Sequence, residues 1–458
     1  MLGFKKIIVT ALLLFLFFTT TTIAFDEYWY GIYLQNSLIG WAKTLFSENN
    51  KSIKIETESR MKIKAMDVSI DISTTNYTTI ATKDFKPESY YYKLKGGIQN
   101  TEIKGKREKD KFKLIIDNGY KILEKTYNID ELTLPAVADY LISKEKLHPD
   151  WKKELNVFSP ELMDKLNIKM SVTGERELIH NKEKIECYII ETLIGNIRML
   201  SFTGKKDNIC YRIDQAAGIS LVLKHKEEIL ARFKDEKEVE IDLMKSFCVP
   251  VNTQLQRGTD KIRLKIRGIS DYHGLEIAGL FQDVMIDKDT LFVTICRRIE
   301  TESRLDKNLY LKDDYDKIIK DKALAITKKC DTNKERVKAL YDWIDKNISK
   351  KVTFSIPDPL QVLKTGQGDC NEISVLFTAF CRSCNISCRT VVGLVGMDDG
   401  FYYHAWNEVL TEDGWQSVDA ALSQFPADAL HLRIVSAEAK DLLKMAGAVC
   451  DYKIEVIE

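Results

Sequence analysis

The sequence has no excess of charge of either sign. Among its 458 residues, 68 Lys and Arg residues balance 68 Asp and Glu residues. A protein that attracts nucleic acid or an anionic membrane by its overall charge needs an excess of Lys and Arg. Neither partner is therefore expected. Low-complexity tracts are also absent, while 45% of the residues are hydrophobic and 30% are charged. This composition is typical of a globular chain, and its length indicates two or three domains.

Long hydrophobic runs are absent beyond the N-terminus. Later apolar runs meet a charge within about ten residues, whereas a membrane-spanning helix needs about 20, so no span is predicted in the mature chain. At the N-terminus, Lys5 and Lys6 precede the apolar run Ile7 to Phe18, and the small residues Thr22 to Ala24 resemble a cleavage site. We predict a signal peptide at residues 1–24 and an exported, periplasmic or extracellular protein. A retained N-terminal anchor is the alternative.

Cysteines are sparse for an exported chain of this length. Their uneven spacing does not resemble a scaffold held together by disulfides, and we expect most of them to be small buried apolar residues. Three of them form a Cys-x2-Cys-x3-Cys cluster that lacks a fourth ligand at a usual spacing, so neither a metal nor a cofactor is expected. The ten cysteines are Cys187, Cys210, Cys248, Cys296, Cys330, Cys370, Cys381, Cys384, Cys388 and Cys450.

The N-terminal half of the mature chain alternates apolar and polar residues in short runs. Such alternation predicts antiparallel strands from Glu27 to about Lys125 and again from Leu166 to about Phe233. Between them, apolar residues at helical spacing predict a short helix from Leu134 to Leu147. Residues 25–245 are therefore predicted to form a β-rich domain without a recognisable motif. Substrate, a cell-wall polymer and a partner protein all remain open as its ligand.

The pattern changes in the C-terminal half. Residues 246–305 are predicted to be a small β segment and linker, with strands at Ile262–Ile266 and Leu291–Ile295. After this linker the apolar period changes from two to about 3.6, which indicates that helices begin a third region, residues 306–458. Its first predicted helices are Asp314–Ile326 and Asn333–Ile348.

A thiol, an imidazole and a carboxylate follow one another in this last region. Cys370 comes after Gly366 and Gly368 and begins an apolar helical pattern, so the thiol is predicted at a helix N-terminus. There, free N–H groups and the helix dipole stabilise a thiolate and an oxyanion, which predicts a lowered thiol pKa. A buried, inert cysteine is the simpler alternative.

His404 and Asp419 lie in two strands that flank a turn signal, Thr411 to Gly414. A two-residue turn places them several residues apart along the ladder, and a three-residue loop places them on opposite faces. A four-residue loop makes them a diagonal pair on one face, close enough to interact. The catalytic geometry therefore depends on one turn.

Together these motifs resemble the transglutaminase-like superfamily of papain-like thiol enzymes. The resemblance rests on Gly368-Asp-Cys-Asn-Glu, Asn385-Ile-Ser-Cys-Arg, Tyr403-His-Ala-Trp and Gly414-Trp-Gln-Ser-Val-Asp. It implies Cys370 as nucleophile, His404 as general base and acid, and Asp419 as the residue that orients the imidazole. The implied fold is α+β, with a papain-like core after the β-rich domain. His431 is expected to be structural, because the triad mechanism needs no second imidazole.

The resemblance predicts a cysteine-dependent acyl-transfer enzyme that acts on peptide or carboxamide bonds of a protein or peptide substrate. Eukaryotic transglutaminases usually carry Gln-Cys-Trp at the nucleophile, whereas this chain has Asp369-Cys370-Asn371. Hydrolysis by a cysteine protease or amidase is therefore favoured over transfer to an amine. Protein crosslinking is one alternative. The other is a non-catalytic binding or scaffold protein that uses the N-terminal β domain.

Overall fold

The computed structural model describes residues 26–458 except for short gaps at 35, 66–67, 97–98, 120–121, 195–196, 216–217, 236–247, 269–276, 302–314, 352–357 and 437–452. The predicted signal peptide, Cys450 and most of the predicted linker lie outside the described residues. The chain forms two compact units whose border falls between Ser246 and Phe247.

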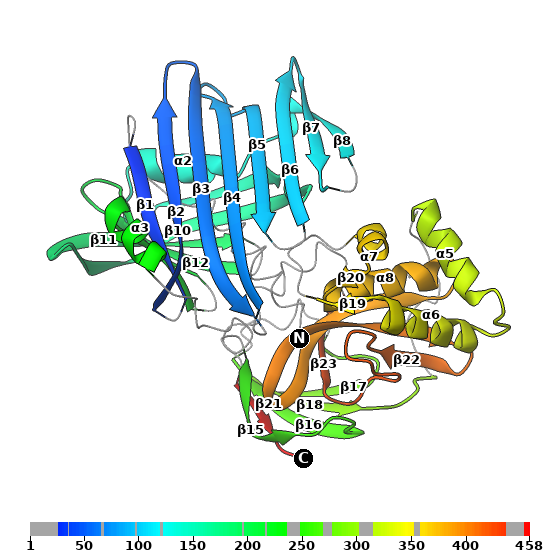
Figure 1. Ribbon diagram of the computed structural model, residues 1–458. Coiled ribbons are helices and arrows are strands. Elements are labelled where there is room, and N and C mark those ends of the chain that lie inside the picture. The colour runs from blue at the N-terminus through cyan, green and yellow to red at the C-terminus, as the bar shows by residue number, and fades with distance from the viewer. Residues whose placement is uncertain are drawn as a thin grey trace. The chain divides into compact units, whose positions relative to one another are not determined.

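The first unit is a single antiparallel sheet of 14 strands (Figure 1). The sheet consists of two meanders, one running from β1 to β8 and the other from β9 to β14. The two meanders join where β1 pairs with β14, for example at Ile32 and Leu221. The strands are β1 (Asp26–Leu34), β2 (Ser37–Glu48), β3 (Ser52–Ala65), β4 (Val68–Ala81), β5 (Pro87–Gly96), β6 (Gln99–Glu108), β7 (Lys111–Asp117), β8 (Ile122–Asn128), β9 (Lys152–Ser159), β10 (Asp164–His180), β11 (Glu183–Ile194), β12 (Ile197–Gly204), β13 (Cys210–Gln215) and β14 (Ile219–Leu223).

Helix α2 (Ala136–Lys144) covers part of one face of this sheet. It follows the 3-10 turn η1 (Ile129–Glu131) and is shorter than the predicted helix from Leu134 to Leu147. One residue before its start, Pro135 is the N-cap, where its missing N–H costs nothing. The apolar cluster between helix and sheet contains Phe46, Ile53, Ile55, Ile80, Val137 and Tyr140.

The long strand β21 (Cys388–Thr411) is the central strand of the second unit. β15 (Val249–Leu255), β22 (Gly414–Val418) and β23 (His431–Ser436) all pair with it. A second sheet has the order β17 (Gln282–Asp287), β18 (Thr290–Cys296), β16 (Lys261–Arg267), β24 (Lys453–Val456). The helices are α5 (Lys317–Thr327), α6 (Asn333–Asn347), α7 (Pro359–Thr365) and α8 (Cys370–Ser383), and β19 (Ser349–Lys350) pairs in parallel with β20 (Gln367–Gly368).

The predicted fold class is confirmed: a large antiparallel β-sheet region precedes a mixed α/β core. The helices near 314–326 and 333–348 and the strands near 262–266 and 291–295 form where the apolar period indicates them. One local prediction is wrong, because strands were expected as far as Phe233 but Lys226–Asp235 form helix α3. The described residues from 248 to 458 belong to one compact unit, in which β15 pairs with β21.

Two further expectations from the sequence concern membranes and disulfides. No helix in the described part of the chain is long and apolar enough to span a bilayer. The nine described cysteines are all free thiols, and six of them are buried. Their burial agrees with the expectation that most are small apolar core residues.

Asp139 is a buried carboxyl in the β unit, on helix α2. Neither of its oxygens has a hydrogen-bond partner among the described residues, and burial raises its pKa well above the usual range. A group whose pKa is raised by folding stabilises the fold below its unfolded pKa, and this contribution is lost as the pH rises. Ionisation of Asp139 therefore opposes folding at neutral pH.

We expect Asp139→Asn to raise the free energy of unfolding by about 1–3 kcal/mol at pH 8. At pH 4 the two proteins are expected to be equally stable, because the Asp139 carboxyl is then protonated in the folded state. Denaturant unfolding at both values measures the difference. Asp150→Asn, at an exposed site, is the matched control and should have no effect. Equal stability of Asp139→Asn and wild type at pH 8 would contradict this account.

Candidate active site

Cys370 is the first residue of helix α8, as the sequence predicts. Asp369 is its N-cap: the side chain accepts the N–H of Asn371 at 2.9 Å and that of Glu372 at 3.4 Å. Glu372 accepts the N–H of Asp369 in return at 3.2 Å, which completes a capping box. Gly366 ends α7 in the left-handed conformation, with φ of 63°, and this lets the chain turn into α8.

The thiol itself lies in a different environment from the predicted one. Cys370 is fully buried, and burial followed by the neighbouring Asp369 carboxylate raises its pKa to about 12. The backbone N–H of Ala405 points at the sulfur and opposes this shift. The expected lowering of the thiol pKa is therefore absent, and the resting group is a neutral thiol. The N–H groups of Asn371 and Glu372, expected to bind an oxyanion, are instead occupied by Asp369.

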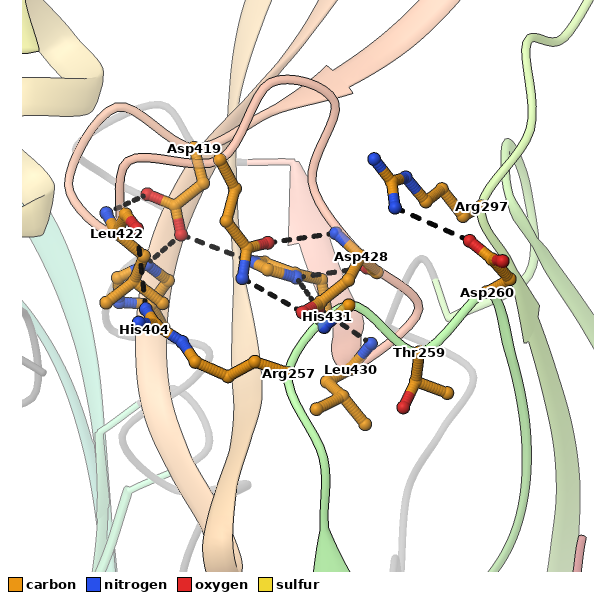
Figure 2. A network of polar contacts seen from close by, with 12 residues as sticks. Arg257, Thr259, Asp260, Arg297, His404, Asp419, Leu422, Asp428, Leu430 and His431 are labelled. Atoms are coloured by element: carbon orange, nitrogen blue, oxygen red, sulfur yellow. Dashed lines mark hydrogen bonds and ion pairs between the residues drawn. The ribbon is translucent and has the colours of Figure 1, made fainter.

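The hairpin formed by β21 and β22 decides whether His404 meets Asp419. Its ladder pairs Leu410 with Trp415 and Glu408 with Ser417, which is the register of the four-residue loop. His404 and Asp419 are thus on one face and diagonal to each other, and His404 Nε2 lies 2.7 Å from Asp419 Oδ2 (Figure 2). The register of the four-residue alternative is confirmed and those of the other two turns are excluded, although Thr411 itself pairs with Gly414, so that only Glu412 and Asp413 lie between the strands.

His404 is held as a neutral base. Burial lowers its pKa to about 4, although the charge of Asp419 acts in the opposite direction. With Nε2–H donated to Asp419, the neutral ring keeps its lone pair on Nδ1, and this atom has no hydrogen-bond partner among the described residues. His404 and Cys370 are both fully buried, and the backbone N–H of Ala405, the residue after His404, lies at the Cys370 sulfur.

Asp419 is a buried carboxylate that accepts four hydrogen bonds. Oδ1 accepts the N–H groups of Ala421 and Leu422, both at 2.9 Å, while Oδ2 accepts His404 at 2.7 Å and His431 at 3.0 Å. Burial alone would raise its pKa, but the two imidazoles outweigh burial and hold the pKa well below the usual range. Asp419 is therefore an anion despite its burial.

Sequence reasoning missed two residues that shape this site. His431, expected to be structural, shares the Asp419 carboxylate, and its spacing from Asp428 was the local signal that pointed to a polar pair. Asn407 ties β21 to α8 by donating to Ser374 O at 2.9 Å and Thr378 Oγ1 at 2.8 Å. No local pattern reveals Asn407, because both partners lie on another element.

A comparison with known protein families matches the segment that contains Cys370, His404 and Asp419. The sequence profile of the transglutaminase-like superfamily matches residues 320–420. This segment is a transglutaminase-like superfamily domain. It includes Cys370, His404 and Asp419 but ends before His431.

The transglutaminase-like domain has distant homologues among the kyphoscoliosis peptidases. Identity is 30% over 106 aligned residues with the Homo sapiens protein, covering 19% of this chain and 16% of that protein. With the Mus musculus protein it is 31% over 103 residues, covering 19% and 15%. The chain thus matches only about a sixth of the length of these relatives.

A solved structure resembles the chain more weakly. A β-barrel-like protein of a domain of unknown function from Brucella abortus aligns with 45% of this chain and 97% of its own, with 11% identity and a TM-score of 0.34. A TM-score of this size carries no functional argument.

His404, Asp419 and His431 are also residue types that bind metal ions, and their ligand atoms lie within 4.8 Å of one another. Both imidazoles, however, are at hydrogen-bond distance from one carboxylate oxygen. A metal would require both Nε2 protons to leave. The hydrogen bonds of His431 to Asp419 and Asp428 outweigh burial and raise its pKa to about 9, which disfavours loss of its proton. The donor set therefore fits a proton network better than a metal.

The charge of Asp369 should limit the reactivity of the Cys370 thiol. Asparagine caps helices as well as aspartate does, so Asp369→Asn keeps the cap and removes only the charge. We expect alkylation of Cys370 by iodoacetamide at pH 8 to become about threefold to tenfold faster, because the thiol pKa falls. Peptide mass spectrometry reads the rate at Cys370 alone. Cys330, which is only partly buried, is the internal control, and an unchanged or slower rate at Cys370 would argue against an electrostatic role of Asp369.

Proposed function

We propose that the chain is a cysteine-dependent acyl-transfer enzyme that hydrolyses peptide or carboxamide bonds, with Cys370, His404 and Asp419 as its triad. The observation that carries the proposal is that Nδ1 of the neutral, carboxylate-bound His404 has no hydrogen-bond partner in the described part of the chain, while the backbone of the next residue, Ala405, meets the buried, helix-terminal thiol of Cys370. The kinship of the domain with peptidases supports the reaction class.

In the proposed mechanism, His404 Nδ1 removes the proton from the Cys370 thiol as the sulfur attacks the carbonyl carbon of the substrate. The C–N bond then breaks, and the same proton passes from Nδ1 to the leaving amine. A thioester between Cys370 and the acyl group remains. Water attacks the thioester, again with His404 as base, and releases the acid and the thiol. Asp419 stays ionised throughout and stabilises the imidazolium of His404.

This order of events suits a neutral thiol. Because the pKa of Cys370 is raised to about 12, no stable thiolate is available before substrate binds, and proton transfer must accompany attack. Water is favoured as the second acceptor because it is abundant. A lysine amine in its place would make the enzyme a crosslinking transferase.

A peptide library incubated with the full chain tests the reaction, with and without an added primary amine. Cleavage, deamidation and amine incorporation change the mass of a peptide in different ways. We expect cleavage or deamidation that disappears, by a factor of at least about 1,000, in Cys370→Ala and in His404→Ala. Cys330→Ala is the matched control and should keep full activity. Dominant amine incorporation would instead support the crosslinking transferase.

The rival proposal is a non-catalytic protein that binds its partner through the β unit. Its support is the complete burial of the Cys370 sulfur, which leaves no direct path for a substrate carbonyl in this conformation. A thiol-directed acyl probe separates the two proposals. Labelling of wild type at Cys370, absent in His404→Ala, supports the enzyme, whereas no labelling of Cys370 together with no peptide turnover supports the binding protein.

We also propose that the protein is exported and that its first 24 residues are removed, on the basis of the basic and apolar segments in the sequence. Expression of the full chain in a bacterial host should yield a secreted or periplasmic protein that starts near Phe25. Intact mass and N-terminal sequencing measure the cleavage. Recovery of the uncleaved chain from the membrane fraction would instead indicate a retained anchor.

A further inference from the structure

Both ring nitrogens of His431 face only hydrogen-bond acceptors among the described residues. Nε2 lies 3.0 Å from Asp419 Oδ2, and Nδ1 lies 3.1 Å from both Asp428 Oδ1 and the Asp428 carbonyl oxygen. A neutral imidazole has only one N–H. If His431 were neutral, its unprotonated ring nitrogen, which is an acceptor, would face an oxygen that is also an acceptor. The geometry therefore requires two N–H groups, and His431 is an imidazolium.

Asp428 is itself anchored firmly enough to hold this cation. Its Oδ2 accepts the N–H of Gly258 and the amide of Gln424, both at 2.9 Å, and its Oδ1 accepts the N–H of Leu430 at 3.1 Å (Figure 2). Gln424 also accepts the N–H of Asp428 at 2.9 Å. Asp428 therefore connects His431 to the backbone at Gly258 and Leu430 and to the side chain of Gln424.

We propose that His431 is a positioning residue of the active site: as a buried imidazolium held by Asp428, it fixes Asp419 so that His404 keeps Nε2–H and presents Nδ1 to Cys370. This inference rests on the proposed acyl-transfer function and adds a fourth and a fifth member to its triad. Neither Asp428 nor His431 lies within the part of the chain that the family profile matches.

The charge balance explains why a second imidazole is useful. A buried carboxylate needs compensation, and without His431 the cheapest compensation for Asp419 is a protonated His404. Such a His404 has no lone pair and is no base. With His431 carrying the positive charge, His404 stays neutral, consistent with its lowered pKa of about 4. With Asp419 and Asp428 ionised, His431 protonated and His404 neutral, the four side chains together carry a net charge of −1.

The other surroundings of His431 are largely fixed. The ring of Trp406 packs edge-on at 5.1 Å, and the ring of His404 lies 6.0 Å away. A cavity of about 20 Å³ borders His431, enough for about one water molecule. The charged groups that line this cavity together with Asp428 and His431 are Arg297, Arg298, Glu408 and Arg433.

The pH dependence of turnover follows from the two imidazoles. Activity needs neutral His404, which exists above its pKa of about 4, and protonated His431, which exists below its pKa of about 9. In His431→Gln, kcat should fall by about 10–100-fold with KM within about twofold, and the loss of activity near pH 9 should disappear. His148→Gln, at an exposed site, is the matched control. Unchanged kcat and an unchanged alkaline limb in His431→Gln would overturn the proposal.

Asp428→Asn provides a second variant where His431→Gln does not fold. It keeps an oxygen for His431 Nδ1 but removes the negative charge, so His431 should lose its proton at lower pH. We expect the alkaline limb to move to lower pH while kcat at pH 6 stays within a few-fold of wild type. A purely structural role of Asp428 would lower stability without moving the limb, and that result would contradict the proposal.

NMR of the full chain with labelled histidines tests the charge of His431 without reference to activity. We expect its ring to be doubly protonated at pH 7 and to titrate near pH 9, and His404 to be the neutral Nε2–H tautomer. Spectra of His431→Gln and His404→Gln assign the signals. A neutral His431 at pH 7 overturns the inference whether or not the enzyme turns over. Wild type without turnover, but with a charged His431, would instead refute the acyl-transfer function.

Discussion

The active site depends on one buried carboxylate. Asp419 lies in the interior as an anion, which is costly unless every lone pair is used, and two backbone N–H groups and two imidazoles meet this demand. The carboxylate thereby joins the end of β22, the middle of β21 and the start of β23. The same carboxylate that orients the imidazole of His404 thus links three neighbouring strands.

The thiol and the base are controlled in opposite ways. Burial and Asp369 keep Cys370 protonated, while burial keeps His404 unprotonated, so the resting protein has a neutral thiol and a neutral imidazole. Many thiol enzymes store the nucleophile as an ion pair, whereas here the ion pair would form only during attack. Asn407 ties β21 to the middle of α8, which fixes the strand that carries His404 against the helix that begins at Cys370.

Much of the fold follows from local patterns. Alternating residues predict the strands of the β unit, and helical spacing predicts α5, α6 and α8 with ends that differ by a few residues. Helix α3 was missed because Lys226–Asp235 is short and mostly polar, so its period is weak. The joining of two meanders through β1 and β14 has no local signal, since the partners are almost 200 residues apart.

By itself, the sequence determined the α+β class, the helix that begins at Cys370 and the order of thiol, imidazole and carboxylate, because these are properties of short segments. The tertiary structure decided the rest. It chose one of three hairpin registers, buried the thiol beside Asp369 and so raised its pKa, and brought His431 to Asp419. Such outcomes depend on solvent exclusion and on partners from other strands, which no stretch of neighbouring residues encodes.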